Sequence, residues 1–142
     1  MSNYSTPLIS IITVSYNAVA TIEQTVLSVI NQDFEDFEYI IVDGGSTDET
    51  VEIIKKYQDR ISLWVSEPDR GIYDAMNKGI RYAKGEFLYF IGADDILIDN
   101  FVLKKVSCFL TSKYNVYYGN VIFKKMNLLY DGEFNSFKIV TR

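Results

Sequence analysis

The chain has 142 residues, of which 48% are hydrophobic, and it is long enough to form one globular domain with a buried core. Its 19 acidic and 14 basic residues give a formal charge of -5 without a Lys or Arg block, which excludes the basic surface that duplex nucleic acid requires. The absence of histidine and the single Cys108 exclude Ser-His and Cys-His catalysis, the usual zinc sites and an intramolecular disulfide.

The first predicted elements are a strand and a helix. Leu8–Val14 is an almost continuous apolar run, which is typical of a strand covered on both faces. Thr21 and Gln24 then form a capping-box pattern, and apolar residues from Ile22 to Ile30 recur at helical spacing. We therefore expect a buried strand followed by an amphipathic helix.

The next stretch repeats this order. Tyr39–Val42 is predicted to be the second strand. Ser46 and Glu49 form another capping box, before a helix whose apolar positions are Val51, Ile54 and Tyr57. Two strands joined by a helix in this way predict a βαβ unit with parallel strands.

The middle of the chain adds two further strands and a helix. Ile61–Val65 is predicted to be the third strand and Phe87–Ile91 the fourth. Between them, Ile72–Ala83 has a helical pattern. Its predicted inward side chains are Met76, Ile80 and Ala83.

The last part contains weaker patterns. Asp99 or Asn100 is expected to cap a helix that runs through Leu110, and Val116–Phe123 and Leu128–Tyr130 are predicted to be strands. The alternation of strands and helices predicts one α/β domain over residues 1–142. Its expected architecture is a Rossmann-type, doubly wound, mostly parallel sheet with helices on both faces.

Ligands of such sheets bind at the carboxyl ends of the strands, and here polar residues follow every predicted strand. Asp94 and Asp95 come directly after the fourth strand, where two like charges need a metal ion or hydrogen-bond donors. The other polar segments are Thr13–Asn17, Asp43–Ser46 and Glu67–Gly71. Each segment alone is compatible with an ordinary turn. Together they predict a single ligand-binding cleft.

Three known types of domain that bind or accept phosphate groups have sequence patterns that this chain does not match. A dinucleotide-binding domain needs glycines after the first strand, where residues 16–19 are YNAV. A P-loop needs a Gly-Lys-Ser/Thr ending, which the chain lacks. A phosphoacceptor receiver domain would place acidic residues after the first strand, where this chain has Ser15 and Asn17. The receiver domain stays open as an alternative.

Four ordered segments resemble the signatures of the family 2 glycosyltransferases, and the resemblance runs from about Leu8 to Asn120. The segments are ISIITVSYN at 9–17, IVDGGSTD at 41–48, EPDRGIYDAMNKG at 67–79 and GADD at 92–95. The third resembles the bacterial branch that builds O-antigen, capsule or exopolysaccharide. The resemblance implies a GT-A fold and inverting transfer of a sugar from a nucleotide diphosphate, such as a UDP-sugar, to a saccharide or lipid-linked acceptor.

The resemblance also implies roles for individual residues. Asp43 would hydrogen-bond the nucleobase, Asp95 would ligate Mn²⁺ or Mg²⁺ on the diphosphate, and Asp94 would face the ribose and add to the metal site. Carboxylate oxygens are ligands that these hard cations prefer. The remaining implied donor-binding residues are Thr13, Ser15, Asn17, Gly45, Asp69, Arg70, Asn77 and Ala93.

Two features depart from the family pattern. Many relatives carry Asp at the position of Gly92, so we expect weaker metal affinity here. The general base of relatives lies in a later part, so we expect it beyond Arg142; Asp131 and Glu133 are weaker candidates in a segment that is typical of a hairpin turn. The chain is thus expected to lack its acceptor part, and a non-catalytic nucleotide-sugar-binding module is the alternative function.

The sequence also gives an expectation for location. The N-terminus lacks a basic start with an apolar core, and no stretch approaches the ~20 apolar residues of a membrane span. We expect a cytoplasmic protein, with peripheral attachment to the cytoplasmic face of the inner membrane through segments outside this chain. Self-association is a further expectation.

Overall fold

The computed structural model describes residues 6–110, 121–123 and 128–130. The chain divides into two compact units, of which the first ends at Cys108 and the second begins at Phe109. The second unit contains the antiparallel strand pair β5 (Val121–Phe123) and β6 (Leu128–Tyr130). The rest of the predicted Val116–Phe123 strand lies outside the described residues.

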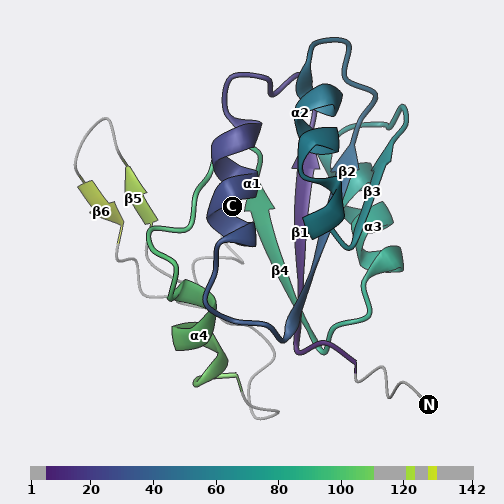
Figure 1. The fold of residues 1–142 in the computed structure, drawn as a ribbon. Helices are drawn as coiled ribbons and strands as arrows, with labels where there is room; N and C mark the ends of the chain where they lie inside the picture. Colours follow the sequence, from purple (N-terminus) through teal and green to yellow (C-terminus); the bar gives the residue numbers. More distant parts are fainter. Residues whose placement is uncertain (1–5, 111–120, 124–127, 131–142) are drawn as a thin grey trace, which may run out of the picture. The chain divides into compact units, whose positions relative to one another are not determined.

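The first unit is built on a four-stranded parallel sheet (Figure 1). Its strands are β1 (Ile9–Ser15), β2 (Phe37–Asp43), β3 (Leu63–Ser66) and β4 (Phe87–Gly92), in the order β3-β2-β1-β4. The chain therefore moves outward from β1 through β2 to β3 and then returns to the other side of β1. This reversal creates a topological switch point beside β1, where α/β sheets bind ligands.

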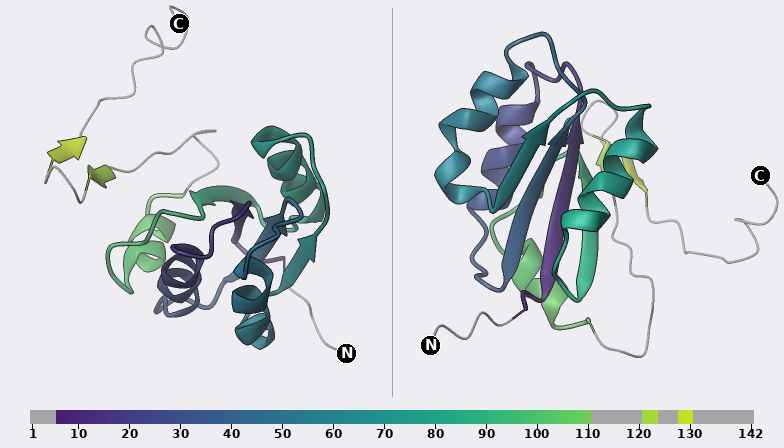
Figure 2. Two further views of the ribbon diagram at one scale, coloured as in Figure 1. Left: turned by 90° about the horizontal axis from the view of Figure 1, so that it is seen from above. Right: turned by 90° about the vertical axis from the view of Figure 1, so that its right-hand side faces the viewer.

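Helices cover both faces of this sheet, as the sequence predicts. The helices α1 (Ile22–Ile30) and α2 (Thr50–Lys56) lie on one face, and α3 (Ile72–Tyr82) lies on the other (Figure 2). A short 3-10 helix, η1 (Gln58–Arg60), precedes β3, and α4 (Val102–Ser107) follows β4. No helix among the described residues is both long enough and apolar enough to span a bilayer.

The core lies between the sheet and α3 on one side and between the sheet and α1 and α2 on the other. On the α3 side, Ile12, Ile40 and Val42 pack against Ala75. Gly79 allows the close approach, because a Cβ there would lie 2.5 Å from Cγ2 of Ile12. The small residues of α3 therefore face the sheet, and the predicted inward orientation of Ile80 is wrong, since Ile80 is 43% exposed.

The predicted helix starts need correction. Neither Thr21 nor Glu49 makes a side-chain capping bond at its helix. Ser46 instead donates from its hydroxyl to Asp43 and accepts from the backbone N–H of Asn17. The capping-box spacing is present, but tertiary partners compete for the Ser46 hydroxyl. The capping-box predictions at Thr21 and Ser46 are therefore wrong.

The later element boundaries are also shorter than predicted. Residues 58–60 form the 3-10 helix, so β3 begins at Leu63 rather than Ile61. Asp99 accepts a hydrogen bond from the N–H of Phe101 at 2.8 Å, and α4 begins at Val102 and ends at Ser107 rather than Leu110. The order of elements is nevertheless the predicted one.

Candidate functional site

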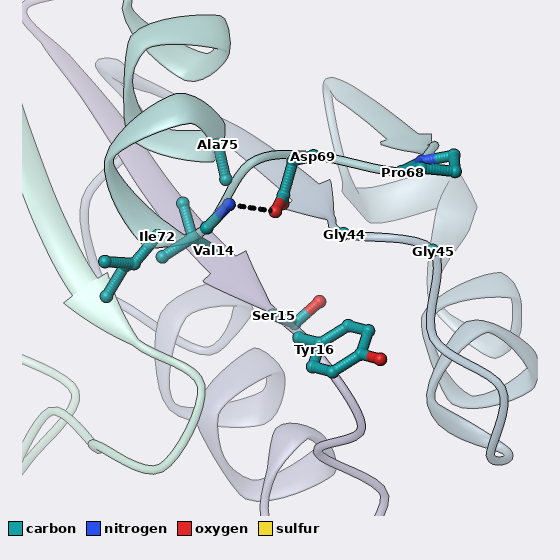
Figure 3. Close-up of a pocket in the computed structure, with 10 residues that line it drawn as sticks. Val14, Ser15, Tyr16, Gly44, Gly45, Pro68, Asp69, Ile72 and Ala75 are labelled. Carbon is teal, nitrogen blue, oxygen red and sulfur yellow. Dashed lines mark hydrogen bonds between the residues drawn. The ribbon is translucent and has the colours of Figure 1, made fainter.

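The carboxyl ends of the parallel strands open into a groove with a volume of about 580 Å³ (Figure 3). The end of β1, the loops after β2 and β3 and the start of α3 contribute residues to it. Its lining consists of Val14, Ser15, Tyr16, Gly44, Gly45, Pro68, Asp69, Gly71, Ile72 and Ala75. The groove therefore lies where the predicted cleft was placed.

A second hollow, of about 340 Å³, adjoins the first on the β4 side. Val14, Tyr16 and Ile72 line both hollows, so the two form one continuous depression across the end of β1. The remaining lining residues of the second hollow are Asn17, Ala18, Thr21, Gly92, Ala93 and Asp94. One end of the depression thus carries Asp69 and the other carries Asp94.

Asp43 lies at the end of β2 and is completely buried. Its Oδ1 accepts hydrogen bonds from the hydroxyls of Ser15 at 3.0 Å and Ser46 at 2.5 Å. Its Oδ2 accepts from the backbone N–H groups of Gly45 at 3.1 Å and Ser46 at 2.8 Å, and from the Ser66 hydroxyl at 2.7 Å. Both oxygens are therefore engaged within the protein, and the carboxylate joins the ends of β1, β2 and β3.

The loop after β1 is fixed by the loop after β2. Asn17 has a positive φ of 49°, and its side-chain oxygen accepts from the N–H of Thr47 at 2.9 Å. Asp48 accepts from the N–H of Val19 at 3.1 Å and from the hydroxyl of Thr50 at 2.5 Å. These bonds favour the ionised form of Asp48 and lower its pKa, with the Thr50 hydroxyl the largest cause. The Tyr16–Asn17 rim of the groove is thereby held in one conformation.

The carboxylate of Asp69 lies directly over Gly44. Its Oδ1 accepts a hydrogen bond from the N–H of Gly71 at 2.7 Å (Figure 3). Its Oδ2 lies 2.5 Å from the position that a Cβ on Gly44 would take. Only a glycine at position 44 leaves this space to the Asp69 carboxylate. No hydrogen bond within the described part of the chain engages Oδ2.

Lys78 holds the loop that carries Asp69 against α3. Its Nζ lies 2.9 Å from the Glu67 carboxylate and donates to the carbonyl oxygen of Pro68 at 3.1 Å. The hydrogen bond with Glu67 raises the pKa of Lys78, and the carboxylates of Asp74 and Asp69 add to the effect. The Lys78 side chain is only 12% exposed. A single cation therefore anchors the loop at two consecutive residues.

The acidic pair after β4 converges on Gly92. An Oδ1 of Asp94 and an Oδ2 of Asp95 lie 2.9 Å and 3.0 Å from the position that a Cβ on Gly92 would take. The turn is closed by a bond from the Asp95 N–H to the Gly92 carbonyl at 3.1 Å, and the Thr25 hydroxyl donates to the Asp95 carbonyl at 2.7 Å. Two hard oxygen donors thus approach one point, although no group of three or more acidic, Cys or His side chains in the described residues is placed to hold a metal.

Tyr89 on β4 lies close enough to this acidic pair to be affected by it. Burial raises the pKa of the Tyr89 phenol, and the negative charge of Asp95 raises it further. The phenol therefore stays protonated and neutral at physiological pH. It adds no charge to this end of the groove.

The structure brings together some of the predicted donor-binding residues and leaves others apart. Those that line the depression are Ser15, Asn17, Gly45, Asp69, Ala93 and Asp94. Thr13 is buried and bonded to the phenol of Tyr39 at 3.0 Å, and Asp43 is enclosed by its own donors. Arg70 and Asn77 are exposed and do not line either hollow. Asp131 and Glu133 lie outside the described residues.

Sequence reasoning gave no role to three residues that shape the groove. Tyr16 and Ile72 are 65% and 59% exposed, large apolar side chains at its rim, and Gly44 provides the space for Asp69. Tyr16 could have been found, because an aromatic residue stands directly after the first strand at the ligand-binding edge. Gly44 could not, because its neighbour Asp69 is contributed by a distant loop.

The model of the family described as Glycosyl transferase family 2 matches residues 10–135. The chain is 36% identical over 134 residues to the PGL/p-HBAD biosynthesis glycosyltransferase of Mycobacterium tuberculosis, covering 91% of this chain and 52% of that protein. It is 34% identical over 138 residues to an uncharacterized glycosyltransferase of Haemophilus influenzae, covering 95% and 53%. The chain thus spans about half the length of the curated relatives that it matches.

Solved structures of similar fold have been determined with nucleotide sugars. TarS residues 1–349 of S. aureus, in complex with UDP-GlcNAc, superposes with a TM-score of 0.65 at 27% identity, covering 82% of this chain and 38% of that one. The mannosyltransferase PcManGT of Pyrobaculum calidifontis, in complex with GDP-Man and Mn²⁺, gives a TM-score of 0.69 at 26% identity, covering 78% and 34%. These neighbours are GT-A transferases, so the fold is of the GT-A type.

Proposed function

The chain belongs to glycosyl transferase family 2, and we propose that it binds the nucleotide diphosphate sugar in an enzyme that transfers the sugar, with inversion, to an acceptor hydroxyl. The observation that carries this proposal is the continuous depression across the end of β1. One end offers a carboxylate and apolar walls suited to a base, and the other offers the acidic pair. A nucleotide diphosphate is an elongated ligand with the same order of chemical groups.

We propose Mn²⁺ or Mg²⁺ as the cofactor at the acidic end. The donor set fits these cations, because Asp94 and Asp95 supply hard oxygens that converge beside Gly92. With two protein carboxylates, the diphosphate and water would have to complete the coordination. When bound, such a cation stabilises the negative charge that develops on the departing nucleotide diphosphate. The Mn²⁺ in the mannosyltransferase complex supports this choice for a related fold.

The other residues of the depression would orient the donor. Ala93 and Asp94 line the hollow on the β4 side, and we assign Asp94 a contact with the ribose in addition to its part in the metal site. The N-terminus of α3 lies at Gly71 and Ile72, where backbone N–H groups and the helix dipole favour a negatively charged group. Arg70 has an exposed side chain beside this helix start and could move to contact the diphosphate. Asn77 lies farther along α3 and is therefore not beside this helix start.

The acceptor and the cellular role are also part of the proposal. We assign a saccharide or lipid-linked acceptor and surface polysaccharide synthesis, including O-antigen, on the motif resemblance at residues 67–79. The relative of Mycobacterium tuberculosis is named for PGL/p-HBAD biosynthesis. A cytoplasmic location, peripheral membrane attachment, self-association and a general base outside the described residues stay predictions.

A panel of nucleotides tests the proposed function. UDP, GDP, dTDP and CDP, each with and without Mn²⁺, are added to the chain, and the melting temperature is followed, because a ligand that binds the native state raises it. We expect stabilisation by at least one nucleoside diphosphate and a larger shift with Mn²⁺ than with chelator. No shift with any nucleotide, under conditions where the chain is folded, would contradict the proposal. Stabilisation without detectable sugar transfer would favour the non-catalytic binding module.

A further inference from the structure

We propose that a polar stripe on and directly after α1, formed by Thr25, Ser28 and Gln32, positions the acidic pair of the metal site. The stripe fixes the backbone of the loop between β4 and α4. The carboxylates of Asp94 and Asp95 are thereby held in place before a cation binds. This inference rests on the proposed function and adds to it residues that contact neither the nucleotide nor the cation.

The three side chains of the stripe share one face. Thr25 and Ser28 lie on α1, and Gln32 lies in the turn that closes the helix, where its N–H donates to the carbonyl of Val29 at 3.2 Å. Their spacings of three and four residues place side chains one above the other on a helix. The stripe can therefore bond to a single segment that runs along the helix.

The stripe begins at the acidic pair itself. The Thr25 hydroxyl donates to the carbonyl of Asp95 at 2.7 Å. The N–H of Asp95 donates to the carbonyl of Gly92 at 3.1 Å. Both backbone groups of Asp95 are thus engaged, one by the turn after β4 and the other by α1. The Asp95 residue is nevertheless exposed, so its carboxylate is accessible to a cation.

The rest of the stripe fixes the residues that follow. The Ser28 hydroxyl accepts from the N–H of Leu97 at 3.1 Å. The Gln32 side chain donates to the carbonyl of Asp99 at 2.6 Å and accepts from the N–H of Leu103, on α4, at 3.0 Å. Residues 93–101 form neither helix nor strand, so the stripe supplies partners that a helix or a sheet would otherwise supply.

Burial couples the loop to α1. Thr25 is completely buried and Gln32 is 9% exposed, while Val26 and Val29 of the same helix lie in the core. A buried hydroxyl or amide is costly unless it is hydrogen-bonded. The loop therefore cannot separate from α1 without leaving these polar groups unpaired, and the position of the Asp95 backbone follows that of the helix.

This coupling matters because the site has few protein ligands. The described residues contain no group of three acidic, Cys or His side chains placed to hold a metal. Oδ1 of Asp94 and Oδ2 of Asp95 already approach one point beside Gly92. A loop that α1 holds needs little ordering when the cation arrives, whereas a released loop would lose affinity to the ordering that binding requires.

Isothermal titration calorimetry with the complete chain, in Mn²⁺ and in EDTA, tests the inference. The titrant is UDP or GDP, whichever binds the unmodified chain more tightly, and the quantity compared is the metal enhancement, the ratio of the affinity in Mn²⁺ to that in EDTA. Thr25→Val keeps the side-chain shape and removes the hydroxyl, so the enhancement should fall at least about threefold. Thr25→Ser keeps a hydroxyl and should restore the enhancement to within about twofold of the parent.

Two further variants complete the comparison. Ser28→Ala removes another bond of the stripe at a partly exposed position and should also lower the enhancement; its result is decisive if Thr25→Val does not fold. Ser10→Ala is the matched control, because Ser10 is also completely buried and bonds to Glu38 at 2.6 Å and to the N–H of Gly85 at 2.8 Å, near the start of β1. The control should lower the free energy of unfolding and leave the enhancement unchanged.

Hydrogen exchange gives a second readout, without nucleotide or metal. In EDTA, the N–H groups of Asp95 and Leu97 should exchange more slowly in the parent than in a short peptide of the same sequence, and faster in Thr25→Val than in the parent. Exchange in the parent at the rate of the peptide would show that the loop is not held before a cation binds, and would overturn the inference.

The outcomes separate this inference from the proposed function. A metal enhancement that neither Thr25→Val nor Ser28→Ala changes, or an equal loss of affinity in Mn²⁺ and in EDTA, would overturn the positioning role while the metal site stands. A parent chain without metal enhancement would overturn the proposed metal site and this inference together. A lower enhancement in either folded variant, with Thr25→Ser and Ser10→Ala close to the parent, supports the inference.

Discussion

Asp43 joins three strand ends through five hydrogen bonds, and its substitution should therefore destabilise the protein. Asp43→Ala leaves two backbone N–H groups and three hydroxyls without their acceptor, so we expect a loss of at least about 3 kcal/mol in the free energy of unfolding. Urea denaturation measures this loss. Ser66→Ala, which removes one donor, should cost only about 1 kcal/mol. An Asp43→Ala variant as stable as the parent, with weaker nucleotide binding, would contradict the structural role.

The sequence indicated which polar residues stand at the strand ends but not which of them face the groove. Thr13 was expected to line it, yet its hydroxyl meets the phenol of Tyr39 across the β1–β2 pairing. Asp69 was found as a groove residue, because it follows a strand in a segment with a specific motif. Its relation to Gly44 depends on a contact between residues far apart in the chain, which no local pattern contains.

At the scale of elements, α3 packs closely against β1 at a glycine, and from this contact we predict how a substitution of the glycine changes the free energy of unfolding. Gly79→Ala would bring a Cβ to 2.5 Å from Cγ2 of Ile12. The helix propensity gain of about 1 kcal/mol should be outweighed by overpacking, so we expect a net loss of roughly 1–2 kcal/mol in the free energy of unfolding.

The exposed position Asn77 on the same helix provides the control. Asn77→Ala should gain roughly 0.5 kcal/mol, because helix propensity alone changes there. Both variants are compared with the parent by urea denaturation. A Gly79→Ala variant more stable than the parent would contradict the close packing of α3 against β1.

The carboxyl group of Asp48, in the loop before α2, should make the free energy of unfolding depend on pH. The bonds to Thr50 and Val19 lower the pKa of Asp48 below its ordinary value of 3.8. A carboxyl group whose pKa is lower in the folded than in the unfolded protein adds stability at pH values above its unfolded pKa. This added stability is lost as the pH falls below the unfolded pKa and through the folded pKa. The free energy of unfolding should therefore decrease as the pH falls below 3.8, and Asp48→Asn should make this decrease shallower. Asp59→Asn, at an exposed Asp in η1, is the control, and an equally steep decrease in Asp48→Asn would contradict the account.

Strands were easier to predict than helix ends. The apolar runs of β1 and β2 are buried on both faces of the sheet, so composition alone identifies them. Helix starts depend on which partner a hydroxyl finds, and Ser46 bonds to Asp43 and Asn17 instead of capping a helix. The inward face of α3 was misassigned at Ile80 because Ala75 and Gly79, the small residues, pack against the sheet.

At the scale of the whole molecule, the strand order places the ligand-binding edge of the sheet where the groove and its polar residues lie. The order β3-β2-β1-β4 creates a switch point at β1, and both hollows of the groove lie at its end. Membership of glycosyl transferase family 2 and the GT-A fold are shown by the comparisons. The chain covers 52% of its mycobacterial relative, so the transfer reaction of the whole enzyme is a proposal, as is the binding of its donor in the groove at the end of β1.

The central claim is that the groove binds a nucleoside diphosphate together with a divalent cation at Asp94 and Asp95. Titration calorimetry of UDP in the presence of Mn²⁺ and in the presence of EDTA tests it most directly, with Asp95→Asn and the Asp59→Asn control measured in parallel. We predict binding about tenfold tighter with Mn²⁺ for the parent and the control, and no effect of Mn²⁺ for Asp95→Asn. Equal affinities of the parent with Mn²⁺ and with EDTA would contradict the claim.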